Sequence, residues 1–397
     1  MHSTVILLCF LLNMLDGADV LVISYAAPLI AKDWSLSLEA LGAVFSAGLF
    51  GMTIGAVALA PLSDSLGRRR MILVALAVIS GGVFLTAWAD SVQELIALRF
   101  CTGLGIGSML ASITSLAAES APVKQRSLAI ALASSGYPMG AALLGIAAAW
   151  ILPTYGWTGV FLLMGALTVA MLPVCFWLLP ESAEFLSSKR SQPTRPKVSA
   201  LLKEHRGGTI LLWTAFFTTF LTLYFLTSWI PKIAVDAGLA IEQAIYAGTC
   251  FNLGAFVGVI LLGWASERFG LARLIGGFFI AAMVFMVLFG AFRVDAWLVL
   301  VEAFSIGFFL QGGFIGLYAV AARLYPTSIR TTGVGWCLGA GRVGAIVGPY
   351  VGGVLMGAGV GITGSFVIFA VPLAIAASAV VAIRFVQNVP PEVVQRS

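Results

Sequence analysis

Five charged side chains lie inside long apolar stretches of the sequence, where a charge needs a chemical reason. Asp16 and Asp19 are three residues apart, so on a helix they would face the same side. Arg99, Arg342 and Glu302 lie singly in three other apolar stretches. If these stretches cross a bilayer, each charge costs about 3 kcal/mol by insertion scales unless it has a partner. All five residues are therefore candidates for a functional site.

The paired aspartates are suited to binding a proton. Two carboxylates that lie close together in a low dielectric do not easily both ionise, so we expect at least one to take up a proton near neutral pH. A carrier that couples the movement of a solute to protons requires such a group. The alternative is a structural pair of carboxylates that buried arginine or amide partners satisfy.

The two arginines are suited to binding an anion. A guanidinium stays charged when it is buried, and it can hold a carboxylate through two parallel hydrogen bonds. Arg99 and Arg342 could each bind an anionic substrate, or each could neutralise Asp16, Asp19 or Glu302. Glu302 stands at the position equivalent to Arg99 in an internal repeat, so it is either the partner of Arg99 or a second proton site.

Polar and aromatic side chains suited to a flat ring accompany these charges. Individually they are weak signals, because Tyr and Trp also populate membrane interfaces. Trp229, close to Pro231 near the end of an apolar stretch, could belong to such an interfacial belt or to a gate. Besides the two arginines, the predicted substrate-binding residues are Asn13, Tyr25, Tyr137, Trp229, Asn252, Gln311 and Tyr318.

The elements that must position these residues are predicted to be transmembrane helices. Of the 397 residues, 60% are hydrophobic and 10% are charged, whereas roughly a quarter of a soluble domain is charged. A bilayer core needs about 20 apolar residues per helix, and charge, Pro and Gly divide the chain into twelve such stretches. They are 4–31, 37–63, 71–90, 93–119, 126–152, 156–179, 209–237, 241–267, 271–292, 295–322, 328–357 and 361–387.

The composition offers little for an enzyme or a metal centre. The five cysteines are unclustered and show no CxxC spacing. The two histidines, His2 and His205, lie at the edges of segments. No nucleophile, base and orienting group recur at a workable spacing, so we predict neither an enzyme nor a bound metal or cofactor.

The basic residues predict the orientation of the chain in the membrane. Seventeen of the 22 Lys and Arg residues fall on one set of loops and helix ends, whereas Lys32, Lys232 and Arg293 fall on the other. The positive-inside rule makes the first set cytoplasmic, and an even number of helices places both termini there. The net charge of +5 is thereby explained by topology, so nucleic acid is not an expected partner.

Two halves of the chain are related by an internal repeat. Asp64 in LSDSLGRRR aligns with Glu267 in ASERFGLAR at an offset of 203, and PVKQR aligns with PTSIR at an offset of 204. We therefore expect parallel repeats with a binding site at their interface near the midplane of the bilayer. The predicted parts are a six-helix bundle over 1–180, a cytoplasmic linker over 181–208 and a second bundle over 209–397.

Glycines at helical spacing predict close helix packing. Small residues four apart let two helices approach closely. Such faces serve static packing, or they allow two halves to repack as they rock. They occur at Gly341, Gly344, Gly348 and Gly352, at Gly136 and Gly140, and at Gly254 and Gly258.

LSDSLGRRR, echoed between the eighth and ninth stretches, resembles the signature loop of the major facilitator superfamily. The first copy departs from the pattern at Ala60 and Ser65, where the second keeps Gly263 and Arg268. The resemblance implies a charged network that locks one conformation, and a solvated face that merely sets topology is the alternative. The network would comprise Asp64, Arg68, Arg69, Glu119, Arg126, Glu181, Glu267, Arg268 and Arg330.

Four strings are similar to the aromatic acid:proton symporter branch of that superfamily. They are DGADVLVISYAAP from Asp16, YFLTSWIP from Tyr224, GVGWCLGAGRVGAIVGPYVGG from Gly333 and LPESAEFL from Leu179. The resemblance implies a monomeric importer of benzoate-like or related carboxylates with protons, in a bacterial inner membrane. An exporter of drugs or metabolites and a carrier of sugars or organic ions are the alternatives on the same fold.

Overall fold

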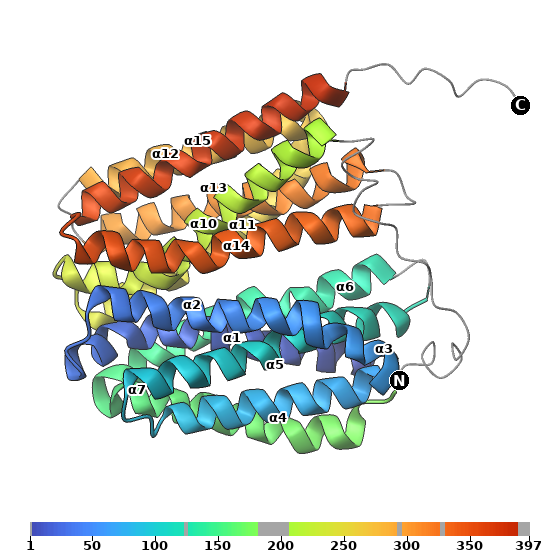
Figure 1. Cartoon of the computed structure of the whole chain (residues 1–397), viewed down its shortest axis with the longest axis vertical. Coiled ribbons are helices and arrows are strands. Elements are labelled where there is room, and N and C mark those ends of the chain that lie inside the picture. The colour runs from blue at the N-terminus through green and yellow to red at the C-terminus, as the bar shows by residue number, and fades with distance from the viewer. Residues whose placement is uncertain (1, 123–125, 182–205, 292–295, 326–329, 388–397) are drawn as a thin grey trace, which may run out of the picture. The chain divides into compact units, whose positions relative to one another are not determined.

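The computed structural model describes residues 2–122, 126–181, 206–291, 296–325 and 330–387 (Figure 1). The secondary structure of these residues consists of helices, and no strand occurs among them. The α-helices are α1 (His2–Asp33), α2 (Leu38–Ile54), α3 (Ser63–Leu66), α4 (Arg68–Thr86), α5 (Val92–Glu119), α6 (Arg126–Ser134), α7 (Gly136–Leu178), α10 (Arg206–Asp236), α11 (Ile241–Phe269), α12 (Leu271–Ala291), α13 (Ala296–Leu324), α14 (Arg330–Gly357) and α15 (Ile362–Gln387).

Eleven helices of the described residues are long and apolar enough to cross a membrane. One of them, Leu132–Leu178, has 47 residues, about twice the length that a bilayer needs. Inside it, Gly156 has a non-helical backbone with φ 65° and ψ −173°, which a glycine adopts without the steric cost of a side chain. The chain turns at this glycine, so the element comprises two spans. Counted in this way, the predicted all-α membrane fold with twelve spans is confirmed.

The second span ends less regularly than the sequence predicts. The helix α2 stops at Ile54 and continues as a π-helix over Gly55–Leu59 and a 3-10 turn over Ala60–Leu62. Pro61 within the turn has no N–H and cannot continue the α-helical hydrogen bonding. Gly67, with φ 98°, then separates the short helix α3 from α4.

Contacts between Cα atoms divide the chain into two compact units. Unit 1 comprises the described parts of 1–192, 226–252 and 349–359, and unit 2 those of 193–225, 253–348 and 360–397. Segments of α10, α11 and α14 therefore belong to unit 1, and the remainder of these helices belongs to unit 2. The predicted boundaries at 180 and 208 stay a prediction, because most of the predicted linker lies outside the described residues.

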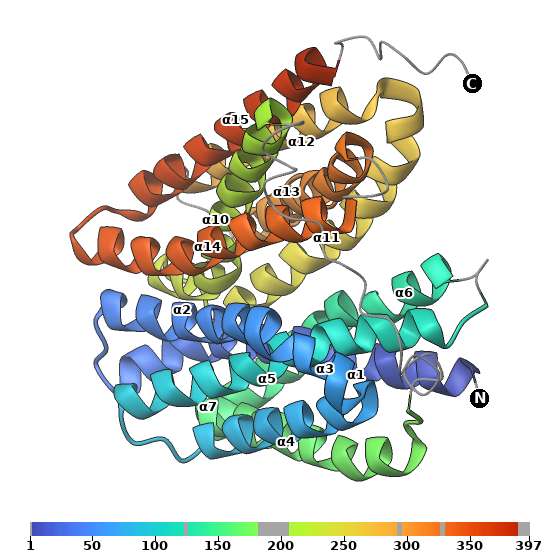
Figure 2. The same cartoon turned by 45° about the vertical axis from the view of Figure 1, so that its right-hand side comes forward.

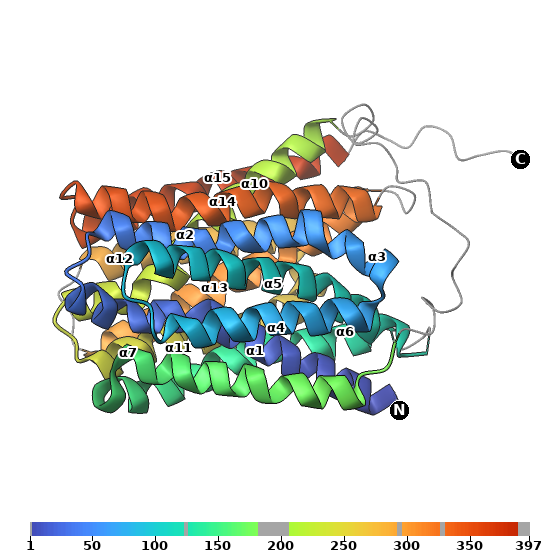
Figure 3. The ribbon, with the colours of Figure 1, turned by 60° about the horizontal axis from the view of Figure 1, so that its bottom comes forward.

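Each unit is a bundle of helices packed side by side. Within unit 1, α5 contacts both α2 and α4, and α1 packs along α7 (Figure 3). Within unit 2, α12 contacts both α13 and α15 (Figure 2). The helix α1, which carries the paired aspartates, is thus held by its neighbours in unit 1.

Close helix approaches recur in both halves at the repeat offset. At each of these approaches a Cβ on a glycine would collide with a backbone carbonyl oxygen of the neighbouring helix. The related pairs are Gly51 on Phe100 and Gly254 on Phe304, Gly55 on Leu104 and Gly258 on Phe308, and Gly140 on Met14 and Gly344 on Phe217. All members are 203 or 204 residues apart. The predicted internal repeat is therefore a repeat of packing geometry as well as of sequence.

Candidate functional site

Asp19 on α1 and Arg99 on α5 form a buried ion pair in unit 1. Arg99 Nη1 lies 3.3 Å from Asp19 Oδ1, and both side chains are 3% exposed. Arg99 Nη2 donates to Thr86 Oγ1 at 3.2 Å. The guanidinium carbon also stands 5.2 Å from the centre of the Phe161 ring, where a cation–π contact is favourable. Of the two roles predicted for Arg99, the structure provides the neutralising partner, Asp19.

Asp16 lies one helical turn before Asp19 and is also buried. Its neighbour Gly17 packs against the backbone of Tyr137, where a Cβ would collide with the carbonyl oxygen. Asn13 is buried as well, and its Nδ2 donates to the carbonyl of Cys9 within the same helix at 3.1 Å. This part of α1 therefore holds two buried carboxylates in a closely packed interior, and Arg99 is the partner of Asp19.

Further along α1, Ser24 contacts α10 within unit 1. Its Oγ lies 2.8 Å from the carbonyl oxygen of Thr227 and 2.9 Å from that of Ser228. Pro231 has no N–H, so the carbonyl of Thr227 lacks the donor that a helix would otherwise supply four residues later. Ser24 takes the place of that donor. Ser24 and Thr227 are 203 residues apart, which is the repeat offset, although the offset by itself does not predict a contact.

Three of the predicted aromatic and amide residues surround this contact. Trp229 is completely buried, and its Nε1 donates to the carbonyl of Pro349 at 3.0 Å. Its burial excludes the alternative of an interfacial belt. The hydroxyl groups of Tyr25 and Thr249 both lie beside Gly145. The third residue is Asn252, whose Nδ2 donates to the carbonyl of Gly248 at 2.9 Å.

Unit 2 contains Arg342 on α14, in different surroundings from Arg99. Arg342 is half-buried, and its Nη1 is buried without a hydrogen-bond partner among the described residues. Tyr318 on α13 lies near the guanidinium. The preceding residue, Gly341, packs against the ring of Phe220 on α10. A cation with an unused donor thus lies next to aromatic side chains.

Those side chains form one aromatic cluster, of which only Tyr318 was predicted from the sequence as a substrate-binding residue. Phe220 stacks on Tyr224 at 5.7 Å between ring centres and meets Phe314 edge-on at 4.8 Å. Phe314 in turn meets Tyr318 edge-on at 5.4 Å, and Phe216 meets Tyr318 at the same distance. Helical spacing in FFTTFLTLYF marks this face, although it is equally typical of core packing.

Glu302 and Gln311 lie on α13, in the same unit. The packing of α5 repeats in α13 at an offset of 204, so Glu302 lies one position before the equivalent of Arg99, which corrects the predicted equivalence. Glu302 is 6% exposed, and its Oε2 has no hydrogen-bond partner among the described residues. Gln311 is half-buried. A proton-binding role for Glu302 and a substrate-binding role for Gln311 stay predictions.

Part of the predicted charged network is assembled at one end of unit 1. Arg68 Nη2 lies 3.4 Å from Glu119 Oε1. The backbone N–H of Arg69 donates to Glu181 Oε1 at 3.1 Å, and its Nη2 donates to the carbonyl of Phe176 at 2.6 Å. These contacts connect the start of α4 to the ends of α5 and α7.

The remaining members of the network are not connected by the described contacts. In unit 2, the guanidinium of Arg268 lies over the ring of Trp264 at 4.6 Å. The side chains of Asp64, Arg126, Glu267 and Arg330 lie outside the part of the chain that the structure describes. Among the described residues, no group of three or more His, Cys, Asp or Glu side chains could hold a metal ion.

The chain matches the profile of the Major Facilitator Superfamily over residues 9–247 and 230–397. A gallate transporter of Pseudomonas putida is 35% identical, with 95% of this chain and 91% of that protein covered. A 4-hydroxybenzoate transporter of Pseudomonas aeruginosa is 34% identical over the same shares. A 3-(3-hydroxy-phenyl)propionate transporter of Escherichia coli is 32% identical, with 90% and 88% covered.

Solved transporter structures share the fold. A bacterial homologue of the human lysosomal transporter Spinster superposes with a TM-score of 0.80 at 20% identity, covering 98% of this chain and 99% of that one. A D-xylose–proton symporter superposes with a TM-score of 0.76 at 17% identity, covering 98% of each chain. The chain therefore belongs to the Major Facilitator Superfamily and, through its relatives, to the aromatic acid:proton symporter family within it.

Proposed function

We propose that this protein imports an aromatic carboxylate together with protons by alternating access. The observation that carries the proposal is Arg342, whose Nη1 is buried without a partner among the described residues. A guanidinium stays charged in such surroundings, and a buried charge without a partner is unfavourable. A carboxylate would supply the missing partner, so Arg342 favours the binding of an organic anion.

The aromatic cluster beside Arg342 favours a substrate that contains a ring. Phe314 and Tyr318 are half-buried and offer ring surface against which a flat ring can pack, with Phe220 packed behind them, and aromatic pairs contribute about 1 kcal/mol beyond their buried area. The relatives named as gallate and 4-hydroxybenzoate transporters support the same class, because both compounds are benzoates with hydroxyl groups. We assign the carboxylate to Arg342 and the ring to this cluster.

The paired aspartates of unit 1 supply the proposed proton site. Arg99 contacts Asp19 at 3.3 Å, so its positive charge is committed to that carboxylate. Asp16 is a second buried carboxylate within one helical turn. If both were ionised, two negative charges would lie within one helical turn in a low dielectric, which is unfavourable. We therefore propose Asp16 as the group that binds and releases the proton, with Asp19 and Arg99 holding its surroundings in place.

Coupling requires that proton and substrate favour the same change of conformation. A ligand shifts a conformational equilibrium only by the difference between its affinities for the two states. Protonation of Asp16 removes a buried charge, and a bound carboxylate compensates the charge of Arg342. Transport of one anion with more than one proton would also use the membrane potential, about 2.3 kcal/mol per charge per 100 mV.

We further propose that the protein lies in a bacterial inner membrane with both termini in the cytoplasm. The excess of Lys and Arg on one set of loops supports this orientation. The charged contacts of Arg68 and Arg69 would then lie on the cytoplasmic side. We propose that they stabilise one of the two conformations of the carrier, as a lock that opens during transport.

Transport by purified protein in lipid vesicles tests the proposal. Uptake of labelled 4-hydroxybenzoate or gallate should require an inward proton gradient and should stop when a protonophore dissipates it. Arg342→Gln should weaken substrate binding by about 30-fold or more, because truncating one partner of a buried charge pair costs about 2 kcal/mol or more. Arg342→Lys should retain part of the affinity, since it keeps the charge without the planar fork.

A matched control for these variants is Arg70→Gln, which removes the same charge at an exposed position outside both clusters. It should transport as the wild type does. An uptake rate that is the same with and without the proton gradient would contradict proton coupling. Unchanged substrate affinity in Arg342→Gln would remove Arg342 from the anion site.

A further inference from the structure

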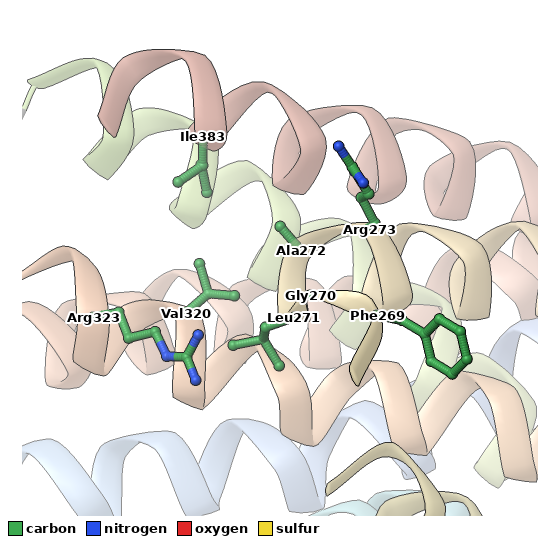
Figure 4. Close-up of a pocket in the computed structure, with 8 residues that line it drawn as sticks. All are labelled: Phe269, Gly270, Leu271, Ala272, Arg273, Val320, Arg323 and Ile383. Carbon is green, nitrogen blue, oxygen red and sulfur yellow. The ribbon is translucent and has the colours of Figure 1, made fainter. Parts of the chain in front are cut away.

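A pocket of about 280 Å³ opens at one end of unit 2 (Figure 4). It lies where α11 passes into α12 and is closed by the last turns of α13 and α15. Its charged lining residues are Arg273 and Arg323, and its apolar lining includes Phe269, Val320 and Ile383. Since one water occupies about 30 Å³, the space accommodates a phosphate group with several waters.

Neither arginine of this pocket donates a hydrogen bond to another residue that the structure describes. Each side chain is exposed, and neither forms an ion pair with another described residue. Gly270 has φ 80°, and a Cβ built on it would meet no atom within 4 Å, so the floor of the pocket is open. The first backbone N–H groups of α12 also have no acceptor within their helix. The lining therefore presents hydrogen-bond donors and positive charge.

The equivalent place in unit 1 contains a carboxylate instead. Gly67 and Gly270 are 203 residues apart, and both have positive φ, 98° and 80°. The helices α5 and α13 are related by an offset of 204, as the packing of Phe100 and Phe304 shows. At that offset, Arg323 corresponds to Glu119.

Because a carboxylate in unit 1 is replaced by an arginine in unit 2, the pocket of unit 2 needs an anion from outside the protein. In unit 1, Glu119 accepts from Arg68 at 3.4 Å, so the protein supplies its own anion. In unit 2, an arginine stands where that carboxylate would be, and Arg273 remains at the position equivalent to Arg70. At the second place Arg323 takes the acidic position, whereas the position of Arg68, which pairs with Glu119 in unit 1, is taken by Leu271.

We propose that this pocket binds the phosphate group of an anionic phospholipid, which replaces the carboxylate of the first repeat. The candidate spans of α12 and α15 begin at Leu271 and end at Ile383, so the pocket lies at the membrane boundary. Phe269 and Trp264 beside it are 64% and 57% exposed, as is typical of side chains that face the lipid interface. Basic pockets between transmembrane helices on the cytoplasmic side are suited to such head groups.

Lipid binding to the purified full chain in detergent tests this proposal. Phosphatidylglycerol should raise the thermal unfolding midpoint and remain bound in native mass spectrometry, whereas phosphatidylcholine should do neither. One basic residue near a membrane surface contributes a factor of about five in affinity for anionic lipid. Arg273→Gln and Arg323→Gln should each weaken phosphatidylglycerol binding about fivefold, and the double variant about 25-fold.

The control variant is Arg70→Gln, the repeat-equivalent of Arg273, which should bind phosphatidylglycerol as the wild type does. The double variant Arg273→Lys/Arg323→Lys keeps the charges and should retain most of the response, which separates lost binding from impaired folding. If the wild type and the double glutamine variant bound phosphatidylglycerol equally well, the proposed site would be wrong. A response to inorganic phosphate as large as that to phosphatidylglycerol would overturn the assignment to lipid.

Discussion

Two arginines of this protein carry the same charge in opposite situations. Arg99 is 3% exposed and is enclosed by Asp19, Thr86 and the ring of Phe161. Arg342 is half-buried, and its Nη1 is buried without a hydrogen-bond partner among the described residues, whereas both Nη atoms of Arg99 have partners and only its Nε lacks one. We infer that Arg99 holds the structure of the proton site and that Arg342 is available to an anion.

Removing Arg99 should leave Asp19 as a buried charge without its cation. Arg99→Gln should therefore lower the stability by about 3 kcal/mol, as breaking one partner of a buried pair does. The double variant Arg99→Gln/Asp19→Asn should recover much of that loss, because it removes the uncompensated charge. Thermal unfolding in detergent measures both changes. A single variant as stable as the wild type would show that the pair contributes nothing.

The sequence identified both arginines as candidates but could not assign their partners. Asp16 and Asp19 share one face of α1, and either could have reached Arg99. Which one does depends on the rotation of α1 against α5, and that rotation is fixed by packing along the whole helix. The aromatic cluster around Phe220 was hidden for a related reason, because a phenylalanine face at helical spacing looks the same in a core and in a binding site.

At the scale of helices, glycines fix how closely α1 can approach α7. A Cβ on Gly140 would collide with the carbonyl oxygen of Met14, and a Cβ on Gly17 with that of Tyr137. These contacts place the part of α1 that carries Asp16 and Asp19. The sequence predicted close packing at Gly140, because Gly136 and Gly140 are spaced for one helix face.

Gly140→Ala should therefore destabilise the protein, whereas Gly277→Ala should not. Forcing an extra methyl group into a closely packed contact costs about 1 to 3 kcal/mol. Gly277 is a matched control, because a Cβ there meets no atom within 4 Å. Gly344→Ala, at the equivalent position of the second repeat, should resemble Gly140→Ala. Unfolding midpoints of the three variants decide this, and equal midpoints would contradict the packing argument.

The contact of Ser24 with α10 depends on Pro231 in a way that a double-mutant cycle can measure. Ser24→Ala should cost about 1 kcal/mol, because the carbonyl of Thr227 loses a hydrogen bond. In a Pro231→Ala background the new N–H can donate to that carbonyl, so the same substitution should cost less. Strictly additive effects on the unfolding midpoint would show that Ser24 does not replace the missing donor.

At the scale of the whole molecule, composition and repeat spacing were sufficient to predict the fold. Twelve apolar stretches and an offset of 203 predicted the spans, and the packing of Gly51 and Gly254 repeats at that offset. The details that escaped prediction are local. The π-helix over Gly55–Leu59 is a hydrogen-bonding adjustment within an otherwise continuous apolar stretch. The break at Gly156, in contrast, falls at the predicted boundary between the spans 126–152 and 156–179.

The repeat also explains how one protein can hold two kinds of site. In unit 1 the buried charges are carboxylates with one arginine, which suits a proton. In unit 2 the intramembrane cation is Arg342, which suits an anion. Coupled import needs both sites, because protons and substrate must cross the membrane together. This is the central claim.

The proton flux that substrate drives tests this claim most directly. Sealed proteoliposomes carry a pH indicator in the lumen and start without a pH difference, and 4-hydroxybenzoate or gallate is then added outside. We predict that the lumen acidifies faster than in protein-free vesicles, which report passive permeation of the acid. Asp16→Asn should abolish the excess acidification while retaining exchange of labelled substrate. Protein-dependent accumulation of labelled carboxylate with a lumenal pH that follows the protein-free vesicles would contradict the account.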